Sequence, residues 1–403
     1  MRALSLGALE GDADAVTGVQ VDSRLVEPGS MFVAIAGGEA FLDDARARGA
    51  AATLVPDDPH AALAALGSAV RARSDARVVA ITGSVGKTST KDILAALLRP
   101  QRRTVAAPRG FNNEIGLPLT LCLIEPDTEV VVTEMAMRGP GQIRELARIA
   151  RPDLGVITSI APVHLEQMGS LENIARAKAE LLDELPAGAV AVLPKDAPEL
   201  EPFVPDGLDV RRFEEPEAEV RADRTHVRWR GRDVVFGFAA RHQAANAAAA
   251  LTAVEALGVE PPAGPVEVEF SLWRLQEAEL PGGGLLINDA WNANPVAMRA
   301  ALAHLLERAN GRRTVAILGE MAELGPEGSR YHEAVGAKTE DVDVVLGVGE
   351  LARHYRPDEW AATAAEAVGV ARGLVRPGDA ILVKGSRSVG LEVVADALLG
   401  GVA

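Results

Sequence analysis

The sequence has little cysteine, few aromatic residues and no long apolar run, and each shortage excludes a feature. The single cysteine, Cys122, rules out an intramolecular disulfide and is expected to be a small buried apolar side chain. Aromatic residues make up 3% of the chain, so its cores must be built mainly from alanine, valine and leucine. Because no run of about 18 apolar residues occurs, we expect no membrane span. The first residues also lack the apolar stretch of a signal peptide, which predicts a cytoplasmic location.

The charge and length of the chain narrow its function and organisation. A net charge of −16 argues against nonspecific binding to nucleic acids. Any polyanionic substrate must therefore be met by local cations or by metal ions. The 403 residues are too many for one ordinary core, and they predict roughly two to four domains.

A phosphate-binding loop is predicted where an apolar strand at residues 78–82 leads through TGSVGKT into a helix. Its glycines let the backbone turn its N–H groups inward, and the helix adds its positive N-terminal end. Lys87 is placed to reach the β- and γ-phosphates, and the Thr88 hydroxyl is placed to ligate Mg²⁺. Ile81 stands where the longer form of this loop has its first glycine, so the loop is the shorter TGxxGKT variant. The predicted nucleotide-binding loop comprises Thr82, Gly83, Ser84, Val85, Gly86, Lys87, Thr88 and Ser89.

The alternation of strands and helices along the chain predicts an α/β fold with three domains. Residues 1–76 are expected to form a small N-terminal α/β domain. Residues 77–268 are expected to form a central P-loop ATPase domain with a mostly parallel sheet and an antiparallel meander at 207–238. Residues 269–403 are expected to form a C-terminal Rossmann-like domain.

Four motifs occur in a fixed order along nearly the whole chain: TGSVGKTSTK at 82–91, FNNEIGLPLT at 111–120, HLEQMGSLENIARAKAE at 164–180 and DAWNANP at 289–295. Together they resemble the Mur ligases, and within them the members that add D-alanyl-D-alanine. The phosphate loop alone would indicate only an NTPase, whereas several motifs in the correct order are highly specific.

The resemblance implies a set of magnesium ligands. Glu134 ends an apolar strand and is implied to hold Mg²⁺ together with Thr88, while His164 is implied to ligate a second Mg²⁺. The resemblance further implies that CO₂ carbamylates Lys178, which requires a neutral amine and hence a depressed pKa, and turns the cation into an anionic Mg²⁺ ligand. On chemistry alone, Glu134 also fits a helix N-cap, His164 a structural histidine, and Lys178 a solvated or phosphate-pairing lysine.

Further nucleotide contacts are implied by the resemblance. Asn113, with its neighbour Asn112, is implied to lie beside the nucleotide, although either residue also fits a helix cap. Asn246 is similar to an adenine-contacting asparagine of the family. Arg274 is similar to an arginine that reaches the γ-phosphate or acyl phosphate, with Trp273 standing where the family has glycine.

The C-terminal segment carries the remaining implied substrate contacts. Asp289 is suited to a ribose hydroxyl, and Asn292 follows it in a motif where Trp291 replaces the family's tyrosine. Lys384 and Arg387 lie in a KGSR element that the family has near its amine-substrate site, and their charge suits the dipeptide carboxylate. A turn with solvated charges is the simpler alternative.

The N-terminal segment is the least family-like. Ser23 and Arg24 match residues that contact the uridine nucleotide in the family. A D-G-H element that usually follows is missing, which puts the nucleotide-sugar contacts in doubt more than the fold.

Taken together, these motifs imply an ATP-dependent ligase that joins D-alanyl-D-alanine to UDP-N-acetylmuramoyl-tripeptide through an acyl phosphate, with ATP and Mg²⁺ as cofactors and Lys87, His164, Lys178 and Arg274 as catalytic residues. We expect a monomer that binds no nucleic acid. Three alternatives stay open: another amide ligase of the family, a P-loop NTPase of different function, and a homologue that binds UDP-sugars without catalysis.

Overall fold

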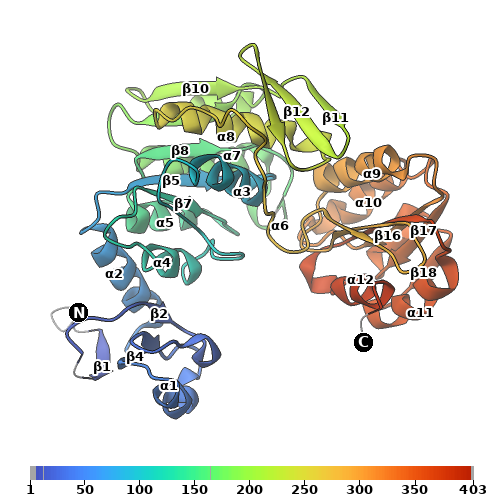
Figure 1. Ribbon diagram of the computed structural model, residues 1–403. Coiled ribbons are helices and arrows are strands. Elements are labelled where there is room, and N and C mark those ends of the chain that lie inside the picture. The colour runs from blue at the N-terminus through green and yellow to red at the C-terminus, as the bar shows by residue number, and fades with distance from the viewer. Residues whose placement is uncertain (1–5, 12, 164, 401–403) are drawn as a thin grey trace.

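The computed structural model describes residues 6–11, 13–163 and 165–400, and within this range the chain forms four sheets arranged in three bodies (Figure 1). Helices cover the mostly parallel larger sheets, so the expected α/β fold class is confirmed. In Figure 1 the blue N-terminal body lies below the central body, and the orange and red C-terminal body lies beside it.

The N-terminal body is a four-stranded sheet in the order β1-β4-β3-β2, in which only β1 runs antiparallel to its neighbour. Short 3₁₀ helices follow β2 and β3. Its core is shared with the central body, because Leu119 packs with Leu63 and Val33 in one apolar cluster. The elements are β1 (Gly7–Glu10), β2 (Val19–Gln20), β3 (Met31–Val33), α1 (Leu42–Ala47), β4 (Ala52–Pro56) and α2 (Pro59–Arg71).

Helix α2 connects the first body to the second. It begins with Asp58, whose carboxylate accepts a hydrogen bond from Ala61 N, and Pro59 occupies the first helical turn. The helix packs against α4 (Gly116–Leu121) and α5 (Gln142–Ala150) of the central body. The two bodies are therefore joined by packed side chains as well as by the chain itself.

The central sheet has six parallel strands in the order β10-β9-β8-β5-β7-β6. Successive residues of β5 face opposite sides, as strand geometry requires: Val79 and Ile81 pack toward α3 and α8, whereas Val78 and Ala80 pack toward α4, α5 and α7. The remaining elements are β5 (Arg77–Thr82), α3 (Lys87–Leu98), β6 (Thr104–Ala106), β7 (Val130–Glu134), β8 (Leu154–Ile157), α6 (Leu165–Met168), α7 (Leu171–Asp183), β9 (Val190–Pro194), β10 (Asp209–Phe213) and α8 (Ala244–Ala256).

The antiparallel meander is shorter than the sequence predicted. Strand β10, expected at its start, instead pairs in parallel with β9 as the last strand of the central sheet. The 3₁₀ helix Pro198–Phe203 carries the chain back over the sheet, so β10 starts from the same edge as β9. The meander itself consists of β11 (Ala218–Arg221), β12 (Arg224–Trp229) and β13 (Arg232–Phe236).

The C-terminal body is a second doubly wound sheet, in the order β14-β15-β19-β16-β17-β18, with β14 antiparallel at one edge. Helices α9 and α10 cover one face, and α11 and α12 cover the other. Strands β14 and β18 were not predicted. The elements are β14 (Gln276–Glu279), β15 (Leu285–Asp289), α9 (Pro295–Ala309), β16 (Thr314–Gly319), α10 (Gly328–Gly336), β17 (Val344–Val348), β18 (Glu359–Ala361), α11 (Ala364–Leu374), β19 (Ala380–Lys384) and α12 (Glu392–Leu398).

Two further expectations concern buried and membrane-spanning segments. Cys122 is half-buried and packs at the edge of the cluster shared by the first two bodies. None of the helices in the described part of the chain has both the length and the apolar character needed to cross a bilayer.

Candidate functional site

The predicted phosphate loop lies between the end of β5 and the start of α3, at the edge of the central sheet where parallel strands end. Gly83 and Gly86 both have positive φ, at 144° and 90°. A methyl group on Gly86 would lie 2.1 Å from Asn246 Oδ1, so only glycine lets the loop approach α8 this closely.

Polar contacts from the segment after β8 fix the shape of the loop. Ser84 Oγ donates to Ala161 O at 3.0 Å, and Thr158 Oγ1 donates to Val85 O at 2.6 Å. Ser159 Oγ accepts the Val85 N–H at 2.9 Å. These contacts hold the loop in place before any ligand binds, which is the pre-organisation that an anion site requires.

Two lysines meet at this loop, half-buried Lys87 and buried Lys178. Lys87 Nζ donates to Gly83 O at 2.7 Å, and burial lowers its pKa, an effect that nearby Glu134 opposes. Lys178, on α7, is 1% exposed, and its pKa is lowered well below the usual value, first by burial and then by the charge of Lys87. The site therefore favours either a neutral Lys178 amine or a bound anion.

Glu134 ends β7, is buried, and accepts a hydrogen bond from Asn112 Nδ2 at 2.8 Å. Its carboxylate and the Thr88 hydroxyl are hard oxygen donors of the kind that Mg²⁺ prefers. Among the residues that the structure describes, no group of three His, Cys, Asp or Glu side chains is gathered as a metal cage. This donor set fits an ion that also takes phosphate oxygens and water. His164, the other predicted ligand, lies outside the described residues.

The two asparagines predicted beside the nucleotide have different surroundings. Asn113 Oδ1 accepts hydrogen bonds from Ile115 N at 3.2 Å and Gly116 N at 2.9 Å, so this side chain caps the start of α4. Asn246, at the start of α8, has its amide nitrogen bonded to Gln243 Oε1 and its oxygen beside the phosphate loop. Their nucleotide contacts stay predictions.

Arg274 joins the third segment to the phosphate loop across 186 positions of sequence. Its Nη2 donates to Thr88 Oγ1 at 3.3 Å, while its buried Nε has no hydrogen-bond partner among the residues that the structure describes. A buried donor without a partner is costly, and an anionic oxygen would satisfy it. This is the position that a phosphate-binding arginine needs.

Asp289 and Lys384 lie at the ends of β15 and β19, which are neighbours in the C-terminal sheet. Both are buried, and Lys384 Nζ donates to Asp289 Oδ2 and, at 2.9 Å, to Asn292 O. The cation predicted to bind the dipeptide and the carboxylate predicted to bind ribose are therefore paired with each other. Arg387, the second predicted dipeptide residue, is exposed and pairs with Glu392.

The predicted uridine-nucleotide residues lie in the N-terminal body, just after β2. Ser23 is buried, whereas Arg24 is exposed and bonds both carboxylate oxygens of Asp22. This contact lowers the pKa of Asp22 to about 2. Neither residue reaches the phosphate loop directly, as expected if a long substrate spans the bodies.

Sequence reasoning missed two parts of the site. Asp92, on α3, accepts the backbone N–H of Ser271 at 2.9 Å and so ties the linker to the phosphate-loop helix. Arg109, in the loop between β6 and α4, lies over the rings of Trp273 and Trp291. The signal for the second part was present, because both tryptophans depart from the family's pattern.

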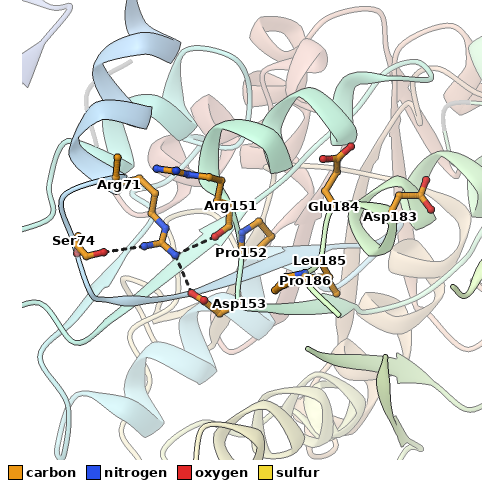
Figure 2. A pocket seen from close by; sticks show the side chains of 10 residues that line it. Arg71, Ser74, Arg151, Pro152, Asp153, Asp183, Glu184, Leu185 and Pro186 are labelled. Carbon is orange, nitrogen blue, oxygen red and sulfur yellow. Dashed lines mark hydrogen bonds and ion pairs between the residues drawn. The ribbon is translucent and has the colours of Figure 1, made fainter. Parts of the chain in front are cut away.

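A separate cavity of about 490 Å³, shown in Figure 2, lies at the opposite edge of the central sheet, where β8 begins. Arg71 dominates it, donating to Ser74 O and Arg151 O and pairing with Asp153 at 3.0 Å. None of the predicted site residues lines it. This cavity marks a structural connection between α2 and the central sheet.

Comparison with known proteins agrees with this geometry. Residues 81–254 match the model of the Mur ligase middle domain, and residues 273–387 match that of the Mur ligase, glutamate ligase domain. The UDP-N-acetylmuramoyl-tripeptide–D-alanyl-D-alanine ligase of Mycobacterium tuberculosis is 34% identical, covering 95% of this chain and 92% of the relative. The ligase of the same name from Escherichia coli is 32% identical, covering 97% and 96%.

A solved structure extends the similarity to three dimensions. The MurF ligase from Thermotoga maritima in complex with ADP superposes with a TM-score of 0.82 at 26% identity, covering 95% of this chain and 97% of that one. The sequence matches and the shared architecture extend over the N-terminal, central and C-terminal bodies alike. The chain belongs to the Mur ligase family.

Proposed function

We propose that this chain is an ATP-dependent ligase that joins D-alanyl-D-alanine to UDP-N-acetylmuramoyl-tripeptide, forming the pentapeptide precursor of peptidoglycan. Full-length relatives with this activity support the proposal. The observation that carries it is the contact between Arg274 and Thr88, because it brings a cation from the third segment to the phosphate loop of the second. A simple P-loop NTPase has no use for that arrangement.

In the first step, the terminal carboxylate of the tripeptide attacks the γ-phosphorus of ATP, giving an acyl phosphate and ADP. Two anions must approach each other, so the chain must offer positive charge where they meet. Lys87 supplies it from the loop and Arg274 from the linker, where the buried Nε–H of Arg274 donates to no other group in the described part of the chain. In the second step, the dipeptide amine attacks the acyl carbon and phosphate leaves.

The metal requirement follows from the oxygen donors at the sheet edge. Thr88 and Glu134 would hold Mg²⁺, which supplies charge neutralisation and orientation of the phosphates. We propose that Lys178 is carbamylated: its ammonium first loses one proton to give the neutral amine, and the amine nitrogen then bonds to the carbon of CO₂ and loses a second proton, which leaves a carbamate anion. The lowered pKa of Lys178 supports this proposal, because only the neutral amine reacts.

The domain limits at residues 76 and 268 are also proposed. Each sheet lies within one of the three resulting segments, and both family-model matches fall inside the second and third. Helix α2 is the exception to a clean division, since it packs on elements of the central segment. We place the reaction in the cytoplasm, where ATP is available.

An ADP-release assay tests the function. With Mg²⁺, ATP, UDP-N-acetylmuramoyl-tripeptide and D-alanyl-D-alanine present, we expect ADP and a product carrying the dipeptide, identified by mass spectrometry. Omission of either peptide substrate should abolish sustained ADP release. Replacement of the dipeptide by single amino acids that support equal turnover would indicate a different amide ligase, and ADP release without either substrate would indicate an ATPase. Lys87→Ala is the inactive control.

A further inference from the structure

The backbone on both sides of Arg274 is strained. Trp273 has a φ of 61° and Leu275 a φ of 48°, a left-handed conformation that side chains with a Cβ rarely adopt. Such strain persists only where the surroundings hold it, and it concentrates at functional positions. The linker around Arg274 must therefore be fixed by specific contacts.

Hydrogen bonds from residues of the C-terminal body hold the backbone of Trp273. Gln276 Oε1 accepts the Trp273 N–H at 2.8 Å, and the Trp291 N–H donates to Trp273 O at 3.3 Å. These contacts place the Trp273 ring 6.1 Å from the Trp291 ring, measured between centroids. They do not connect the segment to the body that carries the phosphate loop.

Arg109 makes that connection at the two tryptophans, in addition to the Asp92–Ser271 hydrogen bond at the start of the linker. Its guanidinium carbon lies 4.1 Å from the centroid of Trp273 and 4.3 Å from that of Trp291, although Arg109 belongs to the central body. A guanidinium over indole faces is a favourable cation–π arrangement. Arg387 lies over the same rings at 4.8 and 5.9 Å, and its charge adds to burial in lowering the pKa of Arg109.

Trp273 and Trp291, the two residues that depart from the family's pattern, both contact Arg109. A glycine at position 273 would adopt the left-handed backbone without strain but would offer Arg109 no ring. Trp273 adopts the strained left-handed backbone, and its ring contacts the Arg109 guanidinium. Trp291 provides a second indole ring for the same guanidinium. One contact thus explains both tryptophans.

We propose that Arg109 is a positioning residue, which holds Arg274 beside the phosphate loop by clamping Trp273 and Trp291 across the interface of the two bodies. The proposal rests on the ligase function, because it assigns Arg109 an effect on the phosphoryl-transfer step through Arg274. Arg109 itself contacts the rings. Arg274 is the residue that touches Thr88.

Steady-state kinetics provide the first test. Arg109→Lys keeps the charge but loses the planar group that stacks, and we expect kcat to fall about tenfold, equivalent to about 1.4 kcal/mol, with the KM for ATP nearly unchanged. Arg353→Lys is the matched control, since Arg353 lies 3.5 Å over Trp360 within the C-terminal body and away from the loop. Wild-type kcat in Arg109→Lys would overturn the proposal.

A double-mutant cycle separates positioning from general damage. If Arg109 acts through Arg274, Arg109→Ala should lower kcat in the wild-type background but have little further effect in Arg274→Ala. A merely structural role would lower kcat by the same factor in both backgrounds, and that result would refute the clamp. Trp273→Gly should lower kcat in parallel with Arg109→Ala.

Fluorescence tests the contact without any turnover. The chain has four tryptophans, so Trp229→Phe/Trp360→Phe leaves only the two clamp rings as reporters. Arg109→Ala in that background should shift the emission and increase acrylamide quenching, while Arg353→Lys should change neither. An unchanged spectrum would show that the clamp is absent in solution. Loss of substrate-dependent ADP release by the wild type, with the spectral change intact, would instead refute the proposed function.

Discussion

The two large parallel sheets end in polar edges of opposite character. At the central edge, half-buried Lys87 and buried Lys178 have lowered pKa values, and Lys87 Nζ donates to the backbone carbonyls of Gly83 and Ser84. At the C-terminal edge, Lys384 and Asp289 neutralise each other. The first edge is therefore incomplete until a ligand or modification arrives, whereas the second is complete by itself. Charge at a strand end indicates a binding site only where the chain has not already balanced it.

Removing the cation of the Lys384–Asp289 pair should have the largest effect on stability. Lys384→Ala leaves the Asp289 carboxylate buried without its cation, and we expect a loss of about 3–5 kcal/mol in the free energy of unfolding, measured with urea. Arg212→Ala, which removes an exposed pair with Glu201, should cost about 1 kcal/mol or less. Lys384→Ala with wild-type stability and a raised dipeptide KM would show that Lys384 belongs to the binding site instead.

A substitution at the central edge should instead lower activity and leave stability unchanged. Lys178→Met replaces a buried amine with an apolar chain of similar length, so stability should be kept while kcat falls about 100-fold or more, because several kcal/mol of charge stabilisation are lost. Intact-protein mass spectrometry of the wild type under bicarbonate should show one added CO₂. The exposed Lys195→Met is the control. Unchanged kcat in Lys178→Met would contradict a role for Lys178 as a ligand.

The stability of the protein should depend on pH through His242. The ring of half-buried His242 lies 5.0 Å from that of His304 between centroids, and desolvation, then His304 and Lys384, lower the pKa of His242 to about 3. Between pH 6.5 and 3 the unfolded chain binds a proton that the folded chain does not, so stability falls as pH falls through this window. From pH 7.5 to 5, we expect His242→Asn to lose about 2 kcal/mol less than the wild type in urea unfolding. Equal losses would show that His242 is free to protonate.

The sequence predicted the phosphate loop because every determinant is local. The strand, the glycines, Lys87 and the helix follow one another within a few residues, and none depends on sheet order. Glu134 could also be placed, since it ends a parallel strand whose neighbour carries the loop.

Sequence reasoning failed where contact depends on which strands become neighbours. The pairing of Asp289 with Lys384 was not foreseen, because nothing local shows that β15 pairs with β19 across three intervening strands. Strand β10 was misassigned for a similar reason: alternation predicted a strand, but a crossover decided its sheet. The contact of Arg109 with Trp273 and Trp291 joins residues more than 160 positions apart. In the sequence, the two tryptophans could therefore be recognised only as departures from the family's pattern.

Arg71, the last residue of α2, restricts rotation between the N-terminal and central bodies. Arg71 donates to Ala150 O and pairs with Asp153, so the N-terminal and central bodies are held together at the edge of the central sheet opposite the phosphate loop. Rotation between them would break these partly buried polar contacts. Arg274 lies in the linker before β14 and contacts Thr88, so any rotation of the third body about that linker would move Arg274 relative to the phosphate loop.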